Sequence, residues 1–114
     1  MTKPVIYACS DSLGETAERV ARAAASQFNQ EEFNIIRVPY IRSEQQIEEI
    51  VQKAEAEQAM ICYTIISPTL RRKLKSLTAS TSVTVVDIIG PMMDGVATIT
   101  QTEPTMKAGM IHRL

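Results

Sequence analysis

Apolar runs alternate with amphipathic segments along most of the chain. The runs are short and nearly continuous, which is typical of buried strands in a parallel sheet. They predict strands at Pro4–Cys9, Phe33–Val38, Ala59–Ile66 and Val83–Ile89. The segments between them repeat apolar residues every three or four positions, and this spacing predicts helices. We expect these helices at Leu13–Phe28, at Glu44–Glu57 and from Ser67-Pro68 onward.

Strands that are joined by helical crossovers form right-handed βαβ units, whose strands pair in parallel. The predicted fold class is therefore α/β, a three-layer α/β/α arrangement with a four-stranded parallel sheet in the order 2-1-3-4. After Gly90-Pro91 the pattern weakens. The apolar residues within 92–97 fit a short helix, whereas Gly95 and the neighbouring threonines disfavour one.

The segment between the first strand and the first helix is rich in hydroxyl groups and has one glycine at the bend. A loop of this kind presents backbone N–H groups and the positive end of a helix dipole to an anion. The alternative is a capped helix without a ligand, because Ser12 and Glu15 have the spacing of a capping box. Asp11 and Glu15 disfavour a highly charged anion. The candidate ligand-binding or interface residues in this segment are Ser10, Asp11, Ser12, Gly14, Glu15 and Thr16.

Two further candidates lie where later strands are expected to end. Ligands of open parallel sheets bind beyond the carboxyl ends of the strands, where Ser67 and Asp87 fall in this chain. Ser67 has a simpler interpretation as the cap of its own helix, and we favour it. Asp87 suits a ribose hydroxyl or a magnesium ion, or else it caps the turn that follows it.

Composition narrows the function classes. A chain of 114 residues fits one domain, and its formal net charge of −1 gives no general attraction to nucleic acid or to an anionic membrane. No apolar stretch is long enough to cross a bilayer, and the N-terminus does not have the pattern of a signal peptide. We therefore expect a cytoplasmic protein.

Nucleophilic and metal-binding side chains are scarce. His112 is the sole histidine, and Cys9 and Cys62 both lie in apolar runs, which predicts two buried, reduced thiols. We therefore expect no metal site and name no catalytic residue. The sequence also has neither the phosphate loop G-x-x-x-x-G-K nor the dinucleotide pattern G-x-G-x-x-G.

Two segments have more than one interpretation. The basic run Arg71, Arg72, Lys73 and Lys75 is typical of a solvated helix face, with docking to a partner as the alternative. The tail Glu103–Leu114 carries several apolar side chains on a polar background. Such a tail either packs back on the domain or leads into a further segment.

The segment Ile6–Ala24 holds the run SDSLGETAE between a strand and an alanine-rich helix. This arrangement resembles the opening of the pyruvate, phosphate dikinase and phosphoenolpyruvate synthase regulatory proteins. The resemblance continues in order to the last residue and covers essentially the whole chain. The later matches are Gln27-Phe28, Val38–Ile41, Tyr63-Thr64, Ser67-Pro68, Leu70-Arg71, Val86–Pro91 and Ala108–Leu114.

This resemblance implies a bifunctional serine/threonine kinase and phosphorylase. Such a protein phosphorylates a threonine of the dikinase or the synthase with ADP as donor, and removes the phosphate with inorganic phosphate as acceptor. Members are more than twice as long as this chain, and their phosphate loop lies in the second half. The resemblance thus implies an N-terminal α/β domain at 1–102 and a tail at 103–114 that leads to a missing phosphate-loop domain. On this basis ADP and phosphate are ligands of the full-length protein. We expect this fragment alone to bind no cofactor and to be inactive. The resemblance allows a homodimer without requiring one.

Two alternatives from other classes remain. The run Ser12–Thr16 is similar to the loop by which flavodoxins hold the phosphate of FMN, although Leu13 and Glu15 depart from that pattern. The aromatic side chains available to flank a flavin are Tyr40 and Tyr63. The other alternative is a non-catalytic interaction domain that uses the same edge of the sheet or the basic helix to bind a partner protein.

Overall fold

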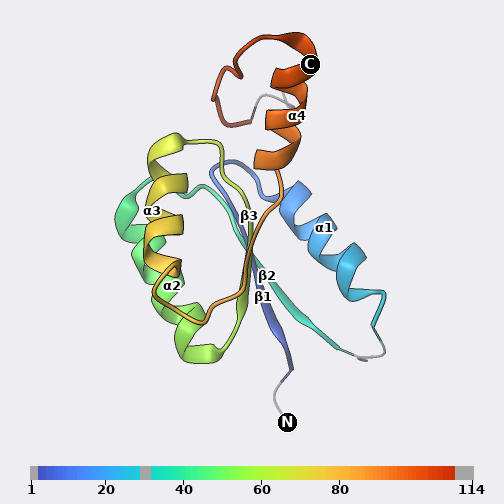
Figure 1. Ribbon diagram of the computed structural model, residues 1–114. Helices are drawn as coiled ribbons and strands as arrows, with labels where there is room; N and C mark the ends of the chain where they lie inside the picture. Colours follow the sequence, from blue (N-terminus) through green and yellow to red (C-terminus); the bar gives the residue numbers. More distant parts are fainter. Residues whose placement is uncertain (1–2, 29–31, 110–114) are drawn as a thin grey trace.

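Strand and helix alternate along the chain in the computed structural model, which describes residues 3–28 and 32–109 (Figure 1). All four predicted strands and all three predicted helices form, with shifts of a few residues at their ends. The elements are β1 (Val5–Ser10), α1 (Glu15–Ala25), β2 (Asn34–Val38), α2 (Glu44–Glu57), β3 (Met60–Thr64), α3 (Pro68–Thr78), β4 (Val85–Asp87) and α4 (Gly90–Thr100).

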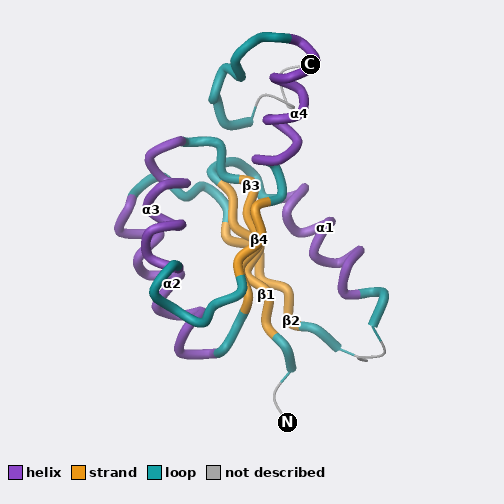
Figure 2. The backbone as a smooth tube through the Cα atoms, in the orientation of Figure 1, coloured by secondary structure: helices purple, strands orange, loops and turns teal. Residues whose placement is uncertain are grey.

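The four strands form one parallel sheet in the order β2-β1-β3-β4, which confirms the predicted fold class and strand order (Figure 2). In this register Tyr7 of β1 lies between Ile36 of β2 and Ile61 of β3. The chain runs outward from β1 to β2 and then crosses back to β3 on the other side of β1. The carboxyl end of β1 is therefore the point at which the direction of winding reverses.

Helices cover the two faces of the sheet unequally. Helices α2 and α3 pack on one face and α1 on the other (Figure 1). Alternate residues of β1 point to opposite faces, so Tyr7 belongs to the larger core with α2 and α3, and Ala8 to the smaller core beneath α1. Ala17 and Ala21 are the α1 residues in that smaller core, and their small side chains let the helix lie close to the strands.

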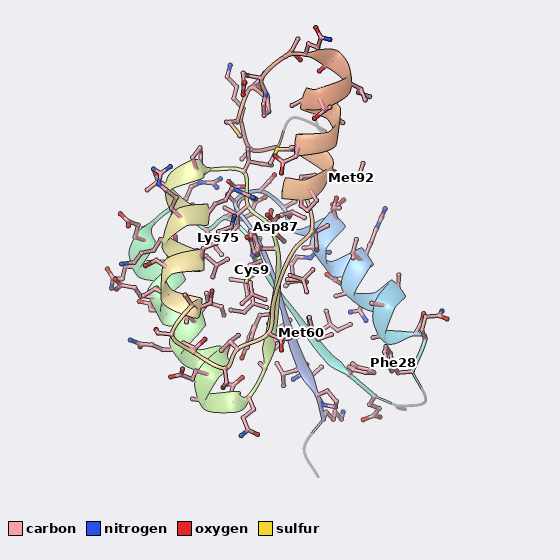
Figure 3. The ribbon with its side chains drawn as sticks, in the orientation of Figure 1. Cys9, Phe28, Met60, Lys75, Asp87 and Met92 are labelled. Carbon is pink, nitrogen blue, oxygen red and sulfur yellow. The ribbon has the colours of Figure 1, made fainter. Side chains whose placement is uncertain are left out.

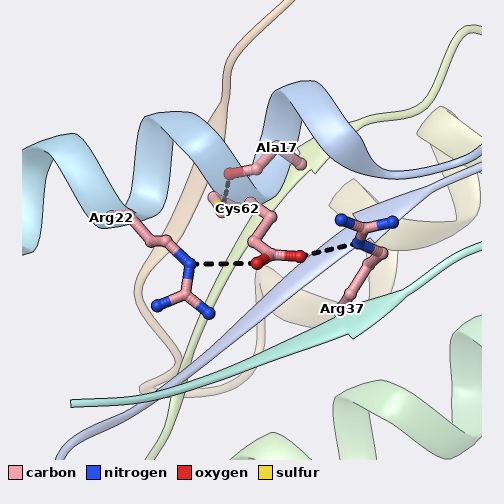
Figure 4. Close-up of polar contacts among 5 residues, drawn as sticks. Ala17, Arg22, Arg37 and Cys62 are labelled. Atoms are coloured by element: carbon pink, nitrogen blue, oxygen red, sulfur yellow. Dashed lines mark hydrogen bonds and ion pairs between the residues drawn. The ribbon is translucent and has the colours of Figure 1, made fainter.

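The two cysteines are buried and free, as predicted. Cys9 lies in the core beneath α2 and α3, whereas Cys62 lies in the core beneath α1, where its thiol contacts the Ala17 carbonyl (Figures 3 and 4). Although they come from neighbouring strands, the two side chains are on opposite faces of the sheet. A disulfide between them would require the sheet to be dismantled.

Local sequence signals explain where helices α2 and α3 begin. Helix α2 begins with a full capping box, in which Ser43 Oγ accepts from the Gln46 N–H and the Gln46 side chain accepts from the Ser43 N–H. Helix α3 begins with Ser67 as cap and Pro68 in its first turn, as predicted. Helix α1 ends at Ala25, before Phe28, whose ring is 65% exposed instead of joining the apolar stripe (Figure 3).

Helix α4 is longer and more regular than the sequence pattern predicted. It spans Gly90–Thr100 and stands beyond the carboxyl ends of the strands (Figure 1). The Oγ1 atoms of Thr98 and Thr100 donate to carbonyls one turn earlier, so these threonines are accommodated within the helix. Met92 and Ile99 are 65% and 82% exposed, so little of the apolar content of α4 is buried against the sheet. Across the described ranges, no helix has the length and apolar content needed to span a bilayer.

Candidate ligand-binding site

A cavity of about 330 Å³ lies beyond the carboxyl ends of β1 and β3, at the start of α1. It is where the winding of the sheet reverses, the place at which open parallel sheets bind ligands. Six of the eight residues predicted from sequence line it: Ser10, Asp11, Ser12, Gly14, Glu15 and Thr16. The structure thus brings the loop residues together, and places Ser67 and Asp87 outside the lining.

Gly14 sets the first turn of α1. It occupies the N-cap position with φ of 87° in the left-handed region, and no side chain accepts a hydrogen bond there. The alternative interpretation, a capping box formed by Ser12 and Glu15, is therefore wrong, because the N-cap residue is Gly14 and Glu15 is the first residue of the helix. A Cβ at Gly14 would also lie 2.9 Å from Cγ of Arg37. The first turn of α1 consequently has no side-chain cap, and Gly14, Glu15 and Thr16 line the cavity.

Asp11 joins the loops that follow β1 and β3. Its side chain is 4% exposed, and Oδ2 accepts hydrogen bonds of 2.9 Å from the backbone N–H groups of Ile66 and Ser67. The Arg42 guanidinium donates to the Asp11 carbonyl. Within residues 3–28 and 32–109, the other carboxylate oxygen, Oδ1, is buried with no hydrogen-bond partner. A buried carboxylate oxygen without a donor is costly to the fold.

Ser10 and Ser12 hold the loop in place through hydrogen bonds of their backbone groups and of the Ser10 side chain. Ser10 Oγ accepts from the Ser12 N–H at 3.0 Å. The N–H groups of Tyr40 and Ile41 donate to the carbonyls of Ser12 and Ser10, at 2.9 and 3.0 Å. This pairing holds the loop against the segment after β2 and leaves the Ser12 and Thr16 side chains lining the cavity.

The chain segment after α4 forms the other wall of the cavity. Pro104, Thr105, Met106, Lys107 and Gly109 all line it. Gly109 lies so close to the loop that an added Cβ would be 3.1 Å from Ser12 Oγ. The described part of the tail therefore packs back on the domain, one of the two interpretations that the sequence allowed. Residues 110–114, with His112, lie outside the described ranges.

Sequence reasoning missed the apolar part of the lining. Ile66, Ile89 and Met93 join Leu13 there; Ile66 follows β3, Ile89 follows β4 and Met93 belongs to α4. The sequence gives no local pattern that marks these residues as cavity lining. Only the rule that parallel strands end at a common edge of the sheet could have indicated the residues that follow β3 and β4. The lining also holds two carboxylates, Asp11 and Glu15, against one ammonium from Lys107.

Ser67 and Asp87 have structural roles in the fold. Ser67 Oγ accepts from the Leu70 N–H at 3.4 Å, the capping role that we favoured. Asp87 accepts from the Gly90 N–H at 2.8 Å and forms an ion pair with Arg71 at 2.5 Å, so both carboxylate oxygens are engaged and it caps the turn before α4. A ribose or magnesium role for Asp87 stays a prediction without support from this geometry.

The basic run of α3 is not uniformly solvated. The Arg71 guanidinium reaches back over the Tyr63 ring, 5.6 Å from its centroid, to meet Asp87. Tyr63 is itself 1% exposed. Because a buried ring cannot stack on a flavin, Tyr40 and Tyr63 do not form the aromatic pair that an FMN site would require.

A charged cluster fixes α1 against the sheet edge. One Glu18 carboxylate accepts from Arg22 at 2.9 Å and from Arg37 of β2 at 2.6 Å (Figure 4). The hydrogen bonds from Arg37 and Arg22 lower the pKa of Glu18 below its ordinary value. The same Arg37 lies against Gly14, so this cluster orients the first turn of α1 toward the cavity.

In the described part of the chain, no three His, Cys, Asp or Glu side chains are grouped so that they could hold a metal ion. The polar residues that line the cavity are five with hydroxyl groups, two with carboxylates and one with an ammonium: Ser10, Ser12, Thr16, Thr64, Thr105, Asp11, Glu15 and Lys107.

Comparison with known proteins identifies the family. The family described as kinase/pyrophosphorylase matches residues 6–114. Relatives that are named pyruvate, phosphate dikinase regulatory proteins match nearly the whole chain. The relative from Carboxydothermus hydrogenoformans is 43% identical over 111 residues, covering 97% of this chain and 40% of the relative. The relative from Halalkalibacterium halodurans is 39% identical over 112 residues, covering 98% of this chain and 42% of the relative.

A relative from Staphylococcus aureus is 40% identical over 116 residues, covering 100% of this chain and 43% of its own length. The chain thus spans about two fifths of the length of the curated relatives that it matches. The matched region includes β1 from Ile6, the loop at the cavity, α4 and the tail. By this match and by these identities, the chain belongs to the kinase/pyrophosphorylase family.

Proposed function

We propose that this chain is the N-terminal α/β domain of a bifunctional protein kinase and phosphorylase that regulates pyruvate, phosphate dikinase or phosphoenolpyruvate synthase. The observation that carries the proposal is the family match over residues 6–114, together with about 40% identity to relatives named as dikinase regulators. The dikinase is the favoured target because those relatives carry its name. A homodimer remains a prediction.

The proposed chemistry consists of two phosphoryl transfers. In the forward reaction a threonine hydroxyl of the target attacks the β-phosphorus of ADP, AMP leaves, and the hydroxyl proton is released. In the return reaction an oxygen of inorganic phosphate attacks the phosphothreonine phosphorus, which frees the threonine and forms pyrophosphate. Both transfers depend mainly on positioning and on stabilising charge on the phosphoryl oxygens.

The cavity supports a ligand-binding or interface role for this domain. It presents N–H groups and hydroxyls to an anion, but the described residues offer a single ammonium, from Lys107, against two carboxylates. That balance disfavours ADP, with its two linked phosphates, as a ligand of this cavity alone. ADP binding and the transfer step are therefore assigned to the part of the relatives that lies beyond this chain.

The test compares this chain with a longer protein. Residues 1–114 are joined to the remaining three fifths of the Carboxydothermus hydrogenoformans relative, and each protein is incubated with purified dikinase and ADP labelled in the β-phosphate. We expect label on a dikinase threonine with the longer protein, and none with the 114-residue chain. The unaltered relative is the control for a competent assay.

Two results would contradict the proposal. Labelling by the 114-residue chain alone would place the transfer residues within it. The second result is a longer protein that folds but is inactive on both dikinase and synthase, while the unaltered relative is active. That result would remove the assignment of this domain to such a regulator.

A further inference from the structure

We propose that the exposed apolar face of α4, formed by Met92, Val96 and Ile99, is the surface on which the rest of a longer protein docks. That rest corresponds to the remaining three fifths of the curated relatives, of which this chain spans about two fifths. The inference rests on the part of the proposed function that makes this chain one domain of a longer regulator. It does not depend on the phosphoryl transfers.

The first step is the placement of apolar residues on α4. Met92, Val96 and Ile99 are spaced by four and three residues, so they share one face of the helix. They are 65%, 50% and 82% exposed, and Figure 3 shows Met92 beyond the end of the sheet. A surface helix normally turns such a stripe toward a core. In α4, all of which is described, Gly90 is the single buried residue.

The second step is the weak intrinsic stability of α4. A helix of eleven residues is marginal without packing, even when its sequence favours helix. Here Gly95 lies in mid-helix, and the one charged residue, Asp94, excludes ion pairs within the helix. Four of the eleven residues are β-branched, which further lowers helix propensity: Val96, Thr98, Ile99 and Thr100. Helix α4 therefore needs a packing partner for its apolar face, and the described residues do not supply one.

The third step is that the base of α4 is fixed. The Gly90 N–H donates to Asp87 Oδ1 at 2.8 Å, which ties the first turn to the end of β4. A groove of about 320 Å³ runs between α4 and the tail, and the half-buried Met93, Ala97 and Pro104 line it. Because the helix is anchored, its apolar face and this groove are presented together in one orientation.

The size of the face favours a linked occupant. Separate proteins in a stable complex each bury roughly 800 Å², far more than three side chains on one helix provide. A domain of the same polypeptide needs less, because linkage gives it an effective concentration on the order of millimolar. The occupant should present an apolar, uncharged surface, since Asp94 is the single charge on α4. A second copy of this chain would have to bind through the same small face.

The path of the tail agrees with this assignment. Thr102 and Pro104 line the groove beside α4, and Gly109 lies against the loop at Ser12. Figure 1 shows α4 and the tail together, beyond the carboxyl ends of the strands. A segment that follows this tail therefore starts at the same end of the molecule as the apolar face of α4.

The first experiment measures amide hydrogen exchange in the 114-residue chain. We expect the amides of α4 to exchange about tenfold faster or more than those of α2 and α3, because nothing covers the helix. Equal protection of the three helices would show that α4 needs no partner, and would overturn the proposal. Protection of α4 that rises with chain concentration would assign the face to a second copy, and would overturn it too.

The second experiment repeats the measurement in a longer protein, with residues 1–114 joined to the remaining part of the Carboxydothermus hydrogenoformans relative. We expect exchange in α4 to slow by about tenfold or more and exchange in α3 to stay unchanged. Unchanged exchange of α4 in a folded longer protein overturns the proposal. If this protein does not fold, the remaining part of the Staphylococcus aureus relative takes its place, and the measurement on the 114-residue chain stands in either case.

The third experiment removes the apolar face. Met92→Gln with Ile99→Gln makes it polar and keeps helix propensity, because glutamine is a good helix former. Phe28→Gln is the matched control, since Phe28 is also 65% exposed but lies at the far end of α1 (Figure 3). In the 114-residue chain neither protein should change its urea midpoint. In the longer protein the double variant should return α4 to the exchange rate of the 114-residue chain, and Phe28→Gln should not.

Two results separate this surface from the proposed function. Protection of α4 that survives the double variant overturns the docking surface, as does an active longer protein with unprotected α4, and both leave the proposed function standing. A longer protein that protects α4 through this face but labels neither dikinase nor synthase would keep the surface and remove the proposed function.

Discussion

Arg71 and Asp87 meet in a two-pronged ion pair, with Nη2 to Oδ2 at 2.5 Å and Nη1 to Oδ1 at 3.2 Å. The pair links α3 to the end of β4, and both side chains are largely buried, at 15% and 20% exposed. Gly90 lies directly against both groups, so that a Cβ there would overlap the carboxylate and the guanidinium. The three residues hold together the strand end, the helix beside it and the start of α4.

Removal of one partner should destabilise the fold. Arg71→Met leaves the largely buried Asp87 carboxylate without its guanidinium partner, and we expect a loss of about 2–3 kcal/mol in the free energy of unfolding. Gly90→Ala should cost a similar amount through overlap. Urea denaturation followed by circular dichroism measures both. Arg72→Met, on the exposed side of the same helix, is the matched control and should change stability by about 0.5 kcal/mol or less. Equal losses in both arginine variants would contradict the role of the pair.

Acid should weaken the same contact. Burial acts to raise the pKa of Asp87, but the hydrogen bonds from Arg71 and from the Gly90 N–H outweigh it, so the pKa lies below its usual value. A carboxyl whose folded pKa is depressed stabilises the fold above its unfolded pKa, about 3.9, and that stability is lost as the pH falls through the folded pKa. We expect the urea midpoint of the wild type to fall more steeply below about pH 4 than that of Asp87→Asn. Parallel profiles for the two proteins would be inconsistent with this linkage.

The two thiols should be inert in the folded protein. Burial raises the pKa of the Cys9 thiol to about 12 and that of Cys62 to about 11. We expect a thiol-specific chromogenic reagent at about pH 8 to react with neither thiol until urea unfolds the chain, and then with both. Above about pH 9 the unfolded thiols ionise before the folded ones, so these groups reduce stability as the pH rises toward their folded pKa values. Rapid labelling of either cysteine in the native state would show that its core opens.

Gly14→Ala tests the left-handed turn at the start of α1. An alanine there pays for a positive φ and meets Cγ of Arg37, so we expect a loss of about 1–2 kcal/mol in the free energy of unfolding. Gly95→Ala provides the control, because nothing lies within 4 Å of an added Cβ and an alanine in mid-helix should stabilise α4 by up to about 1 kcal/mol. Thermal unfolding of both variants gives the comparison. A neutral Gly14→Ala would mean that the turn is not required.

Local patterns predicted the sheet and the first three helices. Each nearly continuous apolar run corresponds to one buried strand, and each apolar stripe corresponds to the buried face of one helix. The order of strands was predicted by analogy with other α/β folds, and the gathering of Ser10–Thr16 at one edge followed from the parallel pairing of the strands. The capping pattern did not reveal the start of α1, because its N-cap, Gly14, has no side chain to accept a hydrogen bond. Helix α4 is longer than the sequence predicted. Its apolar residues Met92 and Ile99 are exposed, so they do not follow the spacing of a buried helix face.

Arg71 shows the limit of charge patterning. In the sequence it is one of four basic residues in a short run, and the neighbouring Arg72 is indeed exposed. Its distinct role depends on Tyr63 and Asp87, which lie eight residues before it and sixteen after it and become its neighbours only when β3 and β4 pair. Contacts of that range leave no periodic signal.

The strand order also has a consequence for synthesis. The chain emerges from its N-terminus, so β1, the inner strand of the sheet, is made before either neighbour. It can pair with β2 once residue 38 has emerged, but its other edge, from Ile6 to Ser10, has no partner until Thr64 has followed. At roughly 5–20 residues per second that interval lasts about one to five seconds. During this time the inner strand of the sheet has one unpaired edge, and such an edge is a template for pairing with another chain.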